Sequence, residues 1–458
     1  MITIQIDNTS KTPIYMQIYS YIRSEIESGK LKSGEKLPSK RAMSSHMNVS
    51  IVTIENAYAQ LLAEGYINSR AGSGFYVEGI DIPLSEKESD KQTETTGEIK
   101  YNFSTSLADT SLFPFSVWAK LSRSTLNLRT TDLLNSCDFR GIPELRKEIA
   151  EYLHRFRGMN VSPERIVIGA GSEYLLCLII QLLGRDMAYG VENPGYRRIY
   201  DIFSLNTSRV FPVPMDDKGA SISAISGFGI DVIHVTPSHH FPLGITMPVT
   251  RRHELLKWAY SRSERYIIED DCDCEFCYGS RPASPLFSLD QNNRVIYINT
   301  FTRTLAPSIR IGYMVLPENL ARRFSDRLGF YSCTVPVFEQ YTLASFMQEG
   351  HFERHINRIR KIYRQRRDTI INNIKSSSLG NITEISGEGS GLHIVLSFKN
   401  GISQNEIISS AAESGVKIHG LTEYYSFPVS DIPDNSVVIG FSGIDTEQID
   451  EAFRNLVK

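Results

Sequence analysis

The most informative run of residues is Val295-Ile-Tyr-Ile-Asn-Thr-Phe-Thr-Arg-Thr-Leu-Ala-Pro-Ser-Ile-Arg-Ile-Gly-Tyr313, whose apolar start is typical of a buried strand. Similar apolar runs occupy residues 165–169, 231–235 and 266–270. Amphipathic stretches with helical spacing separate these runs, and this alternation is typical of βαβ units. We therefore expect residues 101–458 to form an α/β domain with a large, mainly parallel sheet. Strand-like segments after about residue 380 and a final helix at 446–457 indicate a smaller α/β subdomain at the C-terminus.

Composition places the chain among globular proteins without a membrane anchor. It has 458 residues, of which 41% are hydrophobic and 22% charged, and its net charge is −3. No apolar run reaches the roughly 18–20 residues that span a bilayer, and the N-terminus lacks the pattern of a secretion signal. Six cysteines in so long a chain are not a disulfide framework. We expect a cytoplasmic protein in which any nucleic-acid contact comes from a local surface.

The first 79 residues have the pattern of a winged helix-turn-helix. Ile14, Ile18, Ile22 and Ile26 recur every four residues, which places them on one helix face. Shorter helices are expected after Pro38 and after Ser50, and residues 66–77 read as two strands joined by a Gly-rich turn. A polar stretch follows that contains no aliphatic or aromatic side chain between 85 and 98. The predicted domains are thus 1–79, a linker at 80–100, and 101–458.

The N-terminal region resembles GntR-type DNA-binding domains over roughly residues 11–78. The resemblance rests on Gly34-Glu-Lys-Leu-Pro-Ser-Lys-Arg41, Val49-Ser-Ile-Val-Thr53 and Ala63-Glu-Gly-Tyr-Ile67. It implies double-stranded DNA as partner, with a recognition helix in the major groove and a wing beside it. The residues expected to contact DNA are Ser39, Lys40, Arg41, Ser50, Ile51, Val52, Thr53, Arg70 and Gly74.

Basic and acidic side chains nearly balance in this module, and Ile51 stands where the family often has arginine. One copy should therefore bind DNA weakly. A homodimer on two half-sites would supply the missing affinity through avidity. The alternative is a helix-turn-helix that serves only in dimerisation.

Residues 101–455 resemble fold-type I aminotransferases, in the form carried by MocR-type (GabR-like) transcription regulators. In those proteins a lysine, seven residues before the arginine that matches Arg310, forms a Schiff base with pyridoxal phosphate. Here that position is Arg303. A guanidinium stays protonated and is a very poor amine nucleophile. The resemblance therefore implies an aminotransferase scaffold without covalent cofactor chemistry, and the chain is not expected to be an enzyme.

The same resemblance assigns a cofactor or effector pocket. Gly171, Ser172 and Glu173 would cradle a phosphate at a helix start, with Arg310 beside it, and Asp270 would pair with a pyridine nitrogen. Glu173 and His240 each stand where glutamine is usual, and Cys272 replaces a tyrosine that contacts the cofactor hydroxyl. The full predicted pocket is Gly171, Ser172, Glu173, Tyr196, Arg198, His240, Asp270, Cys272, Arg303 and Arg310.

Three functions fit these observations. The leading hypothesis is a DNA-binding transcription regulator that dimerises through its aminotransferase-like domain and senses a small anionic ligand, such as non-covalent pyridoxal phosphate. The second is a pyridoxal phosphate-dependent aminotransferase with a DNA-binding domain, against which Arg303 argues. The third is a regulator that senses a metal or thiol redox state through Cys272, Cys274 and Cys277, although their spacing is not a standard zinc pattern.

Overall fold

The computed structural model describes residues 12–27, 30–70, 73–78, 99–105, 108–128, 131–279, 282–427 and 432–456. The chain divides into two compact units, 1–94 and 95–458. Apart from Ile99 and Lys100, the predicted linker at 80–100 lies outside the described residues, as does the predicted turn at Ala71 and Gly72 between the two short strands.

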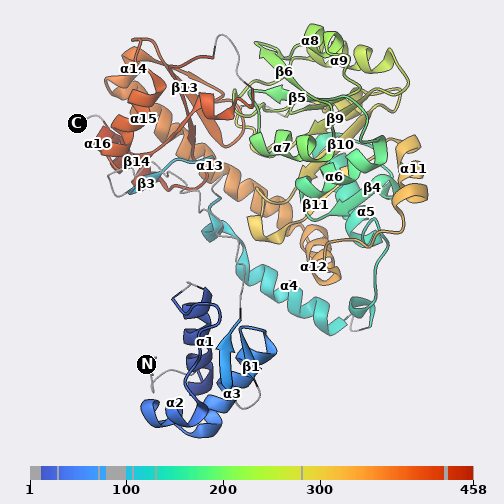
Figure 1. Cartoon of the computed structure of the whole chain (residues 1–458). Helices are drawn as coiled ribbons and strands as arrows, with labels where there is room; N and C mark the ends of the chain where they lie inside the picture. Colours follow the sequence, from blue (N-terminus) through green and yellow to red (C-terminus); the bar gives the residue numbers. More distant parts are fainter. Residues whose placement is uncertain are drawn as a thin grey trace. The chain divides into compact units, whose positions relative to one another are not determined.

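The first unit consists of three helices and a hairpin (Figure 1). Its elements are α1 (Ile14–Glu27), α2 (Lys40–Met47), α3 (Ile51–Ala63), β1 (Ile67–Arg70) and β2 (Gly74–Val77). The two strands pair antiparallel, with Arg70 opposite Gly74. The predicted winged helix-turn-helix is confirmed.

The small core of this unit follows the isoleucine spacing of α1. Ile18 and Ile22 are fully buried and Ile26 nearly so, and they pack with Ile54 and Tyr58 of α3. Burial of side chains of this size stabilises the fold by roughly 1.5–3 kcal/mol each. The helices α1 and α3 are thereby fixed against each other, which leaves the other face of α3 exposed.

The second unit contains an eight-stranded sheet in the order β4-β11-β10-β9-β8-β5-β6-β7. The strands are β4 (Ile166–Gly169), β5 (Tyr189–Asn193), β6 (Val210–Asp216), β7 (Gly219–Ala220), β8 (Val232–Val235), β9 (Tyr266–Asp270), β10 (Val295–Thr300) and β11 (Gly312–Val315). From β10 to β6 every neighbouring pair is parallel, whereas β11 runs antiparallel to both of its neighbours. The predicted mainly parallel sheet is confirmed, with β11 and β7 as its antiparallel members.

Helices cover both faces of this sheet, as parallel strands require. Adjacent residues of β9 show it: Ile267 packs in the cluster that contains Leu255 of α9, and Ile268 in the cluster that contains Leu176 of α6. The helices are α4 (Phe115–Leu128), α5 (Pro143–Tyr152), α6 (Ser172–Leu183), α7 (Arg197–Asn206), α8 (Ile222–Gly227), α9 (Val249–Tyr260), α10 (Leu286–Leu289), α11 (Glu318–Leu328), α12 (Val337–Gln348), α13 (His351–Ser376), α14 (Leu379–Ile382), α15 (Gln404–Glu413) and α16 (Thr446–Leu456). Shorter helical turns are η1 (Thr110–Leu112), η2 (Asp132–Leu134), η3 (Leu153–Arg157), η4 (Pro163–Arg165), η5 (Pro307–Ile309) and η6 (Leu421–Tyr424).

The C-terminal part builds a second sheet of four antiparallel strands in the order β12-β13-β16-β15. Its strands are β12 (Thr383–Ser386), β13 (His393–Phe398), β15 (His419–Gly420) and β16 (Ser436–Gly440). Near it, β3 (Tyr101–Asn102) pairs in parallel with β14 (Val416–Lys417), so the start of the second unit joins its end. The chain then finishes in α16, as the sequence predicted.

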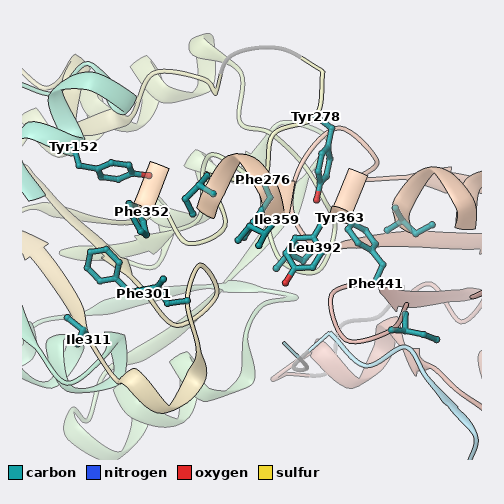
Figure 2. Close-up of a cluster of buried hydrophobic side chains, with 14 of the residues drawn as sticks. Tyr152, Phe276, Tyr278, Phe301, Ile311, Phe352, Ile359, Tyr363, Leu392 and Phe441 are labelled. Carbon is teal, nitrogen blue, oxygen red and sulfur yellow. The ribbon is translucent and has the colours of Figure 1, made fainter. Parts of the chain in front are cut away.

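Helix α13 links the two sheets of the second unit through one hydrophobic cluster (Figure 2). At its start, the ring centroid of Phe352 lies 5.5 Å from that of Phe301, in the loop after β10. Further along, Tyr363 contacts Phe276 at 5.2 Å, and Phe441 lies beyond β16 in the same cluster. The shared core holds the segments around both sheets in place.

Candidate functional site

A cavity of about 180 Å³ opens in the second unit at the carboxyl ends of its parallel strands. Glu192, His234, Asp270 and Thr300, from β5, β8, β9 and β10, stand at or near the last position of each strand and line it. Ligand sites of α/β proteins lie in this place because the loops that follow the strands meet there. The remaining lining residues are Ser172, Glu173, Val191, Gly195, Tyr196, Arg198, Ile199, Tyr200, Thr236, His239, Phe241, Cys272, Asp273, Thr302, Arg303 and Arg310.

Most residues of the predicted pocket line this one cavity. Those that do are Ser172, Glu173, Tyr196, Arg198, Asp270, Cys272, Arg303 and Arg310. Gly171 lies directly behind the lining at the start of α6. The expectation that His240 lines the cavity is corrected by the structure. His240 is buried, with its Nε2 3.6 Å from Oε2 of Glu192, and its neighbour His239 lines the cavity instead. The backbone hydrogen bond from His240 to Ile245 fixes the loop in this direction.

The carboxylate of Glu173 is the most consequential side chain in the cavity. Its Oε2 accepts a hydrogen bond from Nη2 of Arg310 at 2.8 Å, and its Oε1 lies 3.4 Å from Nη1 of Arg198. Glu173 also stands in the first turn of α6, where the helix dipole favours a negative charge. The predicted phosphate cradle thus already contains an anion of the protein itself.

The position of Arg310 explains the glycine at 171. Arg310 has a φ of 51°, a left-handed conformation that side chains other than glycine rarely adopt. Its Nη2 also donates to the carbonyl of Ala170 at 3.3 Å. Gly171 has a φ of 91°, and a Cβ there would lie 3.0 Å from the guanidinium. Glycine at 171 therefore allows Arg310 to lie over the turn.

Asp270 ends β9 and is buried at the cavity wall. Its Oδ1 accepts from the backbone N–H of Cys272 at 3.2 Å, and its Oδ2 lies 3.5 Å from Nε2 of His234. Burial raises the pKa of the Cys272 thiol well above its ordinary value, and Asp270 adds to the effect. Cys272 is therefore a protonated thiol here and not a thiolate.

Arg303 follows β10 and reaches into the cavity from the loop. Its Nη1 donates to the carbonyl of Thr105 at 2.9 Å. Burial raises the pKa of the Asp273 carboxyl, and the charge of Arg303 partly offsets that rise. Within the described residues no lysine lines the cavity, so the residues present do not fit a Schiff-base cofactor.

Two histidines, His239 and His393, lie side by side at the edge of this cavity, and the sequence pattern did not predict this pair. His239 Nε2 lies 3.4 Å from Nδ1 of His393 on β13, and His393 Nε2 donates to the carbonyl of Pro242 at 2.8 Å. Burial lowers the pKa of His393 to about 4 and that of His239 well below its ordinary value. The pair is therefore uncharged. Because 154 residues separate the two histidines, only the fold brings them together.

The N-terminal turn of α3 presents an open surface in the first unit. Ile51 and Val52 are 44% and 61% exposed. The Ser50 hydroxyl accepts from the backbone N–H of Thr53 at 3.1 Å, and no acidic residue lies in the first turn. A helix start of this kind suits the phosphates and base edges of a nucleic acid.

The other predicted DNA-contacting residues lie at the start of α2 and in the hairpin. Ser39 caps α2 by accepting from Ala42 at 3.2 Å, and Arg41 is exposed in the first turn of that helix. Lys40 pairs with Glu55 at 3.1 Å. In the hairpin, the Arg70 guanidinium lies 4.5 Å from the ring centroid of Tyr76, and Gly74 has a φ of 116°.

Two further findings concern partners. No helix in the described part of the chain is both long and apolar enough to cross a bilayer. Over the same residues, no group of three or more His, Cys, Asp or Glu side chains is placed to hold a metal ion. Burial raises the pKa of Cys274, as it does for Cys272. Cys272 and Cys274 of the predicted cysteine segment are therefore protonated thiols.

Each of the two units matches a known protein family. Residues 99–456 match the aminotransferase class I and II family, and residues 14–77 match the gntR family of bacterial regulatory proteins. The uncharacterized HTH-type transcriptional regulator YdeL of Bacillus subtilis is 38% identical over 461 residues, covering 99% of this chain and 98% of that protein. The probable rhizopine catabolism regulatory protein MocR of Rhizobium meliloti is 29% identical over 475 residues, covering 98% and 94%.

Among solved structures, an archaeal alanine:glyoxylate aminotransferase superposes with a TM-score of 0.68 at 24% identity, over 78% of this chain and 89% of that one. A likeness at this identity shows the fold alone. The full-length matches to regulators are more specific, because they include both units. The chain therefore belongs to the family of HTH-type transcription regulators of the MocR kind, in which a gntR-family domain is joined to an aminotransferase class I and II domain.

Proposed function

We propose that the first unit binds duplex DNA with the start of α3 in the major groove. The observation that carries this proposal is the exposed turn of Ser50, Ile51 and Val52, which has no acidic residue to repel phosphates. Apolar side chains at such a turn contact thymine methyl groups, and hydroxyls accept or donate at base edges. Arg41, at the start of α2, contacts a phosphate and sets the position of the helix.

The experiment is a selection of bound fragments from a random duplex library, followed by footprinting with the full-length protein. The expected result is a site of two half-sites, direct or inverted, with binding that weakens steeply as salt rises. Binding of equal strength to all sequences would contradict the proposal.

The second unit, we propose, forms a homodimer. Large apolar side chains are exposed on α4, on η2, before α12 and on α12 itself: Phe115, Leu134, Phe330 and Phe338. These elements are neighbours in the fold, because α12 packs against both α4 and η2. Apolar side chains that gather in one region of a surface mark an interface. Light scattering at micromolar concentration should give twice the mass of the 51.7 kDa chain, and a monomer mass would contradict it.

The cavity of the second unit, on this proposal, binds a ligand without covalent catalysis. The resemblance places Arg303 where those regulators carry the Schiff-base lysine, and no lysine is among the described residues that line the cavity. A guanidinium keeps its proton and does not condense with an aldehyde. The chain thus acts as a regulator and not as an aminotransferase, even though Asp270 remains in place for a cationic ring nitrogen.

The ligand carries a small anionic group, and the charges of the cavity restrict its kind. Arg198, Arg303 and Arg310 face Glu173, Asp270 and Asp273 in the lining, so the charges nearly cancel. A single carboxylate is accommodated more easily than a phosphate dianion, because Glu173 already occupies Arg310. Titration calorimetry with pyridoxal phosphate, unphosphorylated pyridoxal and a set of small carboxylic acids tests this, with a carboxylate expected to bind most tightly. If pyridoxal phosphate binds most tightly of all, the charge argument fails.

A further inference from the structure

Two cysteines far apart in the sequence contact the same buried glutamine. Cys137 lies between η2 and α5, and Cys333 lies between α11 and α12. Both are half-buried free thiols. One nitrogen, Nε2 of Gln340, lies 3.6 Å from the sulfur of Cys137 and 3.5 Å from that of Cys333. The two sulfur atoms therefore share one hydrogen-bond donor.

Gln340 holds this arrangement rigidly. Its side chain is fully buried, its Oε1 accepts from the backbone N–H of Ile142 at 2.8 Å, and its Nε2 also donates to the carbonyl of Val335 at 2.8 Å. An amide fixed at both ends cannot rotate away from the sulfur atoms. The loop of Cys137 and the loop of Cys333 are thus held together by a common contact.

The two thiols differ in their chemistry. The interaction between the two thiols lowers the pKa of Cys137 and raises the pKa of Cys333. The thiolate is the reactive form of cysteine. In contrast, burial raises the pKa of Cys177, Cys272 and Cys274. A nucleophilic thiolate next to a protonated thiol is the arrangement that forms a disulfide.

We propose that Cys137 and Cys333 form an oxidant-sensitive pair that a hydroperoxide converts into an intrachain disulfide. The Cys137 thiolate attacks one peroxide oxygen, the O–O bond breaks, and a sulfenic acid and hydroxide form. Cys333 loses its proton to the hydroxide, giving water, and its sulfur displaces a second hydroxide from the sulfenic acid as the S–S bond forms. That hydroxide takes a proton from solvent, so hydrogen peroxide ends as two waters and the two thiols lose two electrons.

The pair is connected to the cavity by two contacts. The Cys333 thiol donates to the carbonyl of Ile168 at 3.7 Å, and the hydroxyl of Thr334 accepts from the backbone N–H of Ala170 at 3.1 Å. Ile168 and Ala170 precede the turn that presents Ser172 and Glu173 to the cavity. A disulfide removes the hydrogen of Cys333 and with it the hydrogen bond to Ile168. Oxidation should therefore change the turn that presents Ser172 and Glu173 to the cavity.

The test uses the reduced full-length protein titrated with hydrogen peroxide. The expected product has lost two hydrogens per chain, and its tryptic map contains a cross-link between residues 130–140 and residues 328–354. Cys137→Ser and Cys333→Ser should each abolish the mass change, whereas Cys177→Ser, at a half-buried cysteine that contacts Asn206, should keep it. A mass loss that survives in Cys137→Ser, or a cross-link between other cysteines, would overturn the proposal.

Alkylation with iodoacetamide at pH 7 supplies a second reading that does not depend on oxidation. Cys137 should be labelled before the other cysteines, and Cys333→Ala should slow its labelling severalfold because the interaction with Cys333 that lowers the pKa of Cys137 is gone. Equal rates at Cys137 and Cys177 would count against the pair. Amide exchange at residues 170–173 should differ between the reduced and oxidised protein, and identical exchange would refute the link to the cavity.

Discussion

The starts of α3 and α6 are built in opposite ways. In α3 the Ser50 hydroxyl caps the helix, the first turn holds no acidic residue, and Ile51 and Val52 are exposed. In α6 the capping residue is a glycine, and Glu173 in the first turn pairs with Arg310 at 2.8 Å. Both starts expose backbone N–H groups that favour anions. The first turn of α3 is open to an outside anion, whereas the first turn of α6 already contains the carboxylate of Glu173.

The same chain therefore contains two helix starts that both favour anions and that are occupied differently. The winged helix keeps an open anion-favouring surface, as contact with DNA phosphates requires. In the aminotransferase-like domain the predicted phosphate cradle holds Glu173, and Arg303 lies on the loop after β10. We propose that the regulator uses its second unit for assembly and for ligand binding without covalent chemistry.

The largest effect is expected when the first turn of α3 receives an acidic residue, as the first turn of α6 has. Val52→Glu places a carboxylate in the exposed first turn, and repulsion from phosphates and base edges should weaken specific DNA binding about 100-fold. A gel-shift titration at fixed salt measures the effect. The control is Leu62→Glu, at the far end of the same helix and 41% exposed, which should bind as the parent does. Unchanged binding of Val52→Glu would remove α3 from the DNA interface.

The buried histidines predict an acid sensitivity that belongs to the second unit. Burial lowers the folded-state pKa of His393 to about 4, below its ordinary value of 6.5. The unfolded chain therefore binds more protons between these values, and the stability that the neutral ring provides is lost as pH falls. Between pH 7 and pH 5 the loss amounts to as much as about 2 kcal/mol.

Because Gln cannot take up this proton, His393→Gln should show a smaller fall in unfolding free energy over the same pH range. Denaturant unfolding at pH 7 and pH 5 measures the difference. His46→Gln, an exposed histidine of the first unit, is the control and should leave the pH slope of the second unit unchanged. An identical slope in the parent and His393→Gln would show that the ring already carries its proton.

Opening the cradle is the converse of the first substitution. Glu173→Gln removes the carboxylate that occupies Arg310, so the affinity for pyridoxal phosphate should rise about tenfold. The matched control is Glu318→Gln, which also removes an acidic residue from the first turn of a helix and an ion pair with an arginine. If calorimetry finds the same affinity in all three proteins, Glu173 does not control ligand choice.

The smallest expected effect comes from a phosphate contact. Arg41→Ala should weaken DNA binding about five- to tenfold on every sequence and reduce the slope of log K against log salt by about 1. Lys30→Ala, an exposed side chain paired with Glu25, should leave both quantities as they are. A change of sequence preference in Arg41→Ala would assign this residue to base contacts instead.

Local patterns in the sequence were sufficient to predict the element order. The four-residue spacing of Ile14, Ile18 and Ile22 marks the buried face of α1 because one helix repeats its face at that interval. The strands at 266–270 and from Val295 onward were also predicted from the sequence, since parallel strands buried on both faces are largely apolar. The direction of β11 was not, because strand direction depends on connections and not on side-chain pattern.

The parts of the site that were missed all depend on contacts between distant residues. No pattern in the sequence places His393 beside His239, or Cys333 beside Cys137, since the fold alone decides these distances. The prediction that His240 lines the cavity was wrong for a related reason: which of two adjacent histidines faces a cavity depends on the path of the loop. Glu173 stands out in the sequence, but its ion pair with Arg310 depends on the fold, because 137 residues separate the two.

One experiment tests the central claim most directly, namely that the chain keeps DNA binding and has lost cofactor attachment. The purified protein is incubated with excess pyridoxal phosphate, treated with borohydride, and divided between intact-mass analysis and titration with its selected duplex. The account predicts no pyridoxyl adduct at the cavity, no visible aldimine absorbance before reduction, and specific, salt-sensitive DNA binding. A borohydride-fixed pyridoxyl adduct on a residue of the cavity in the unmodified sequence would contradict it.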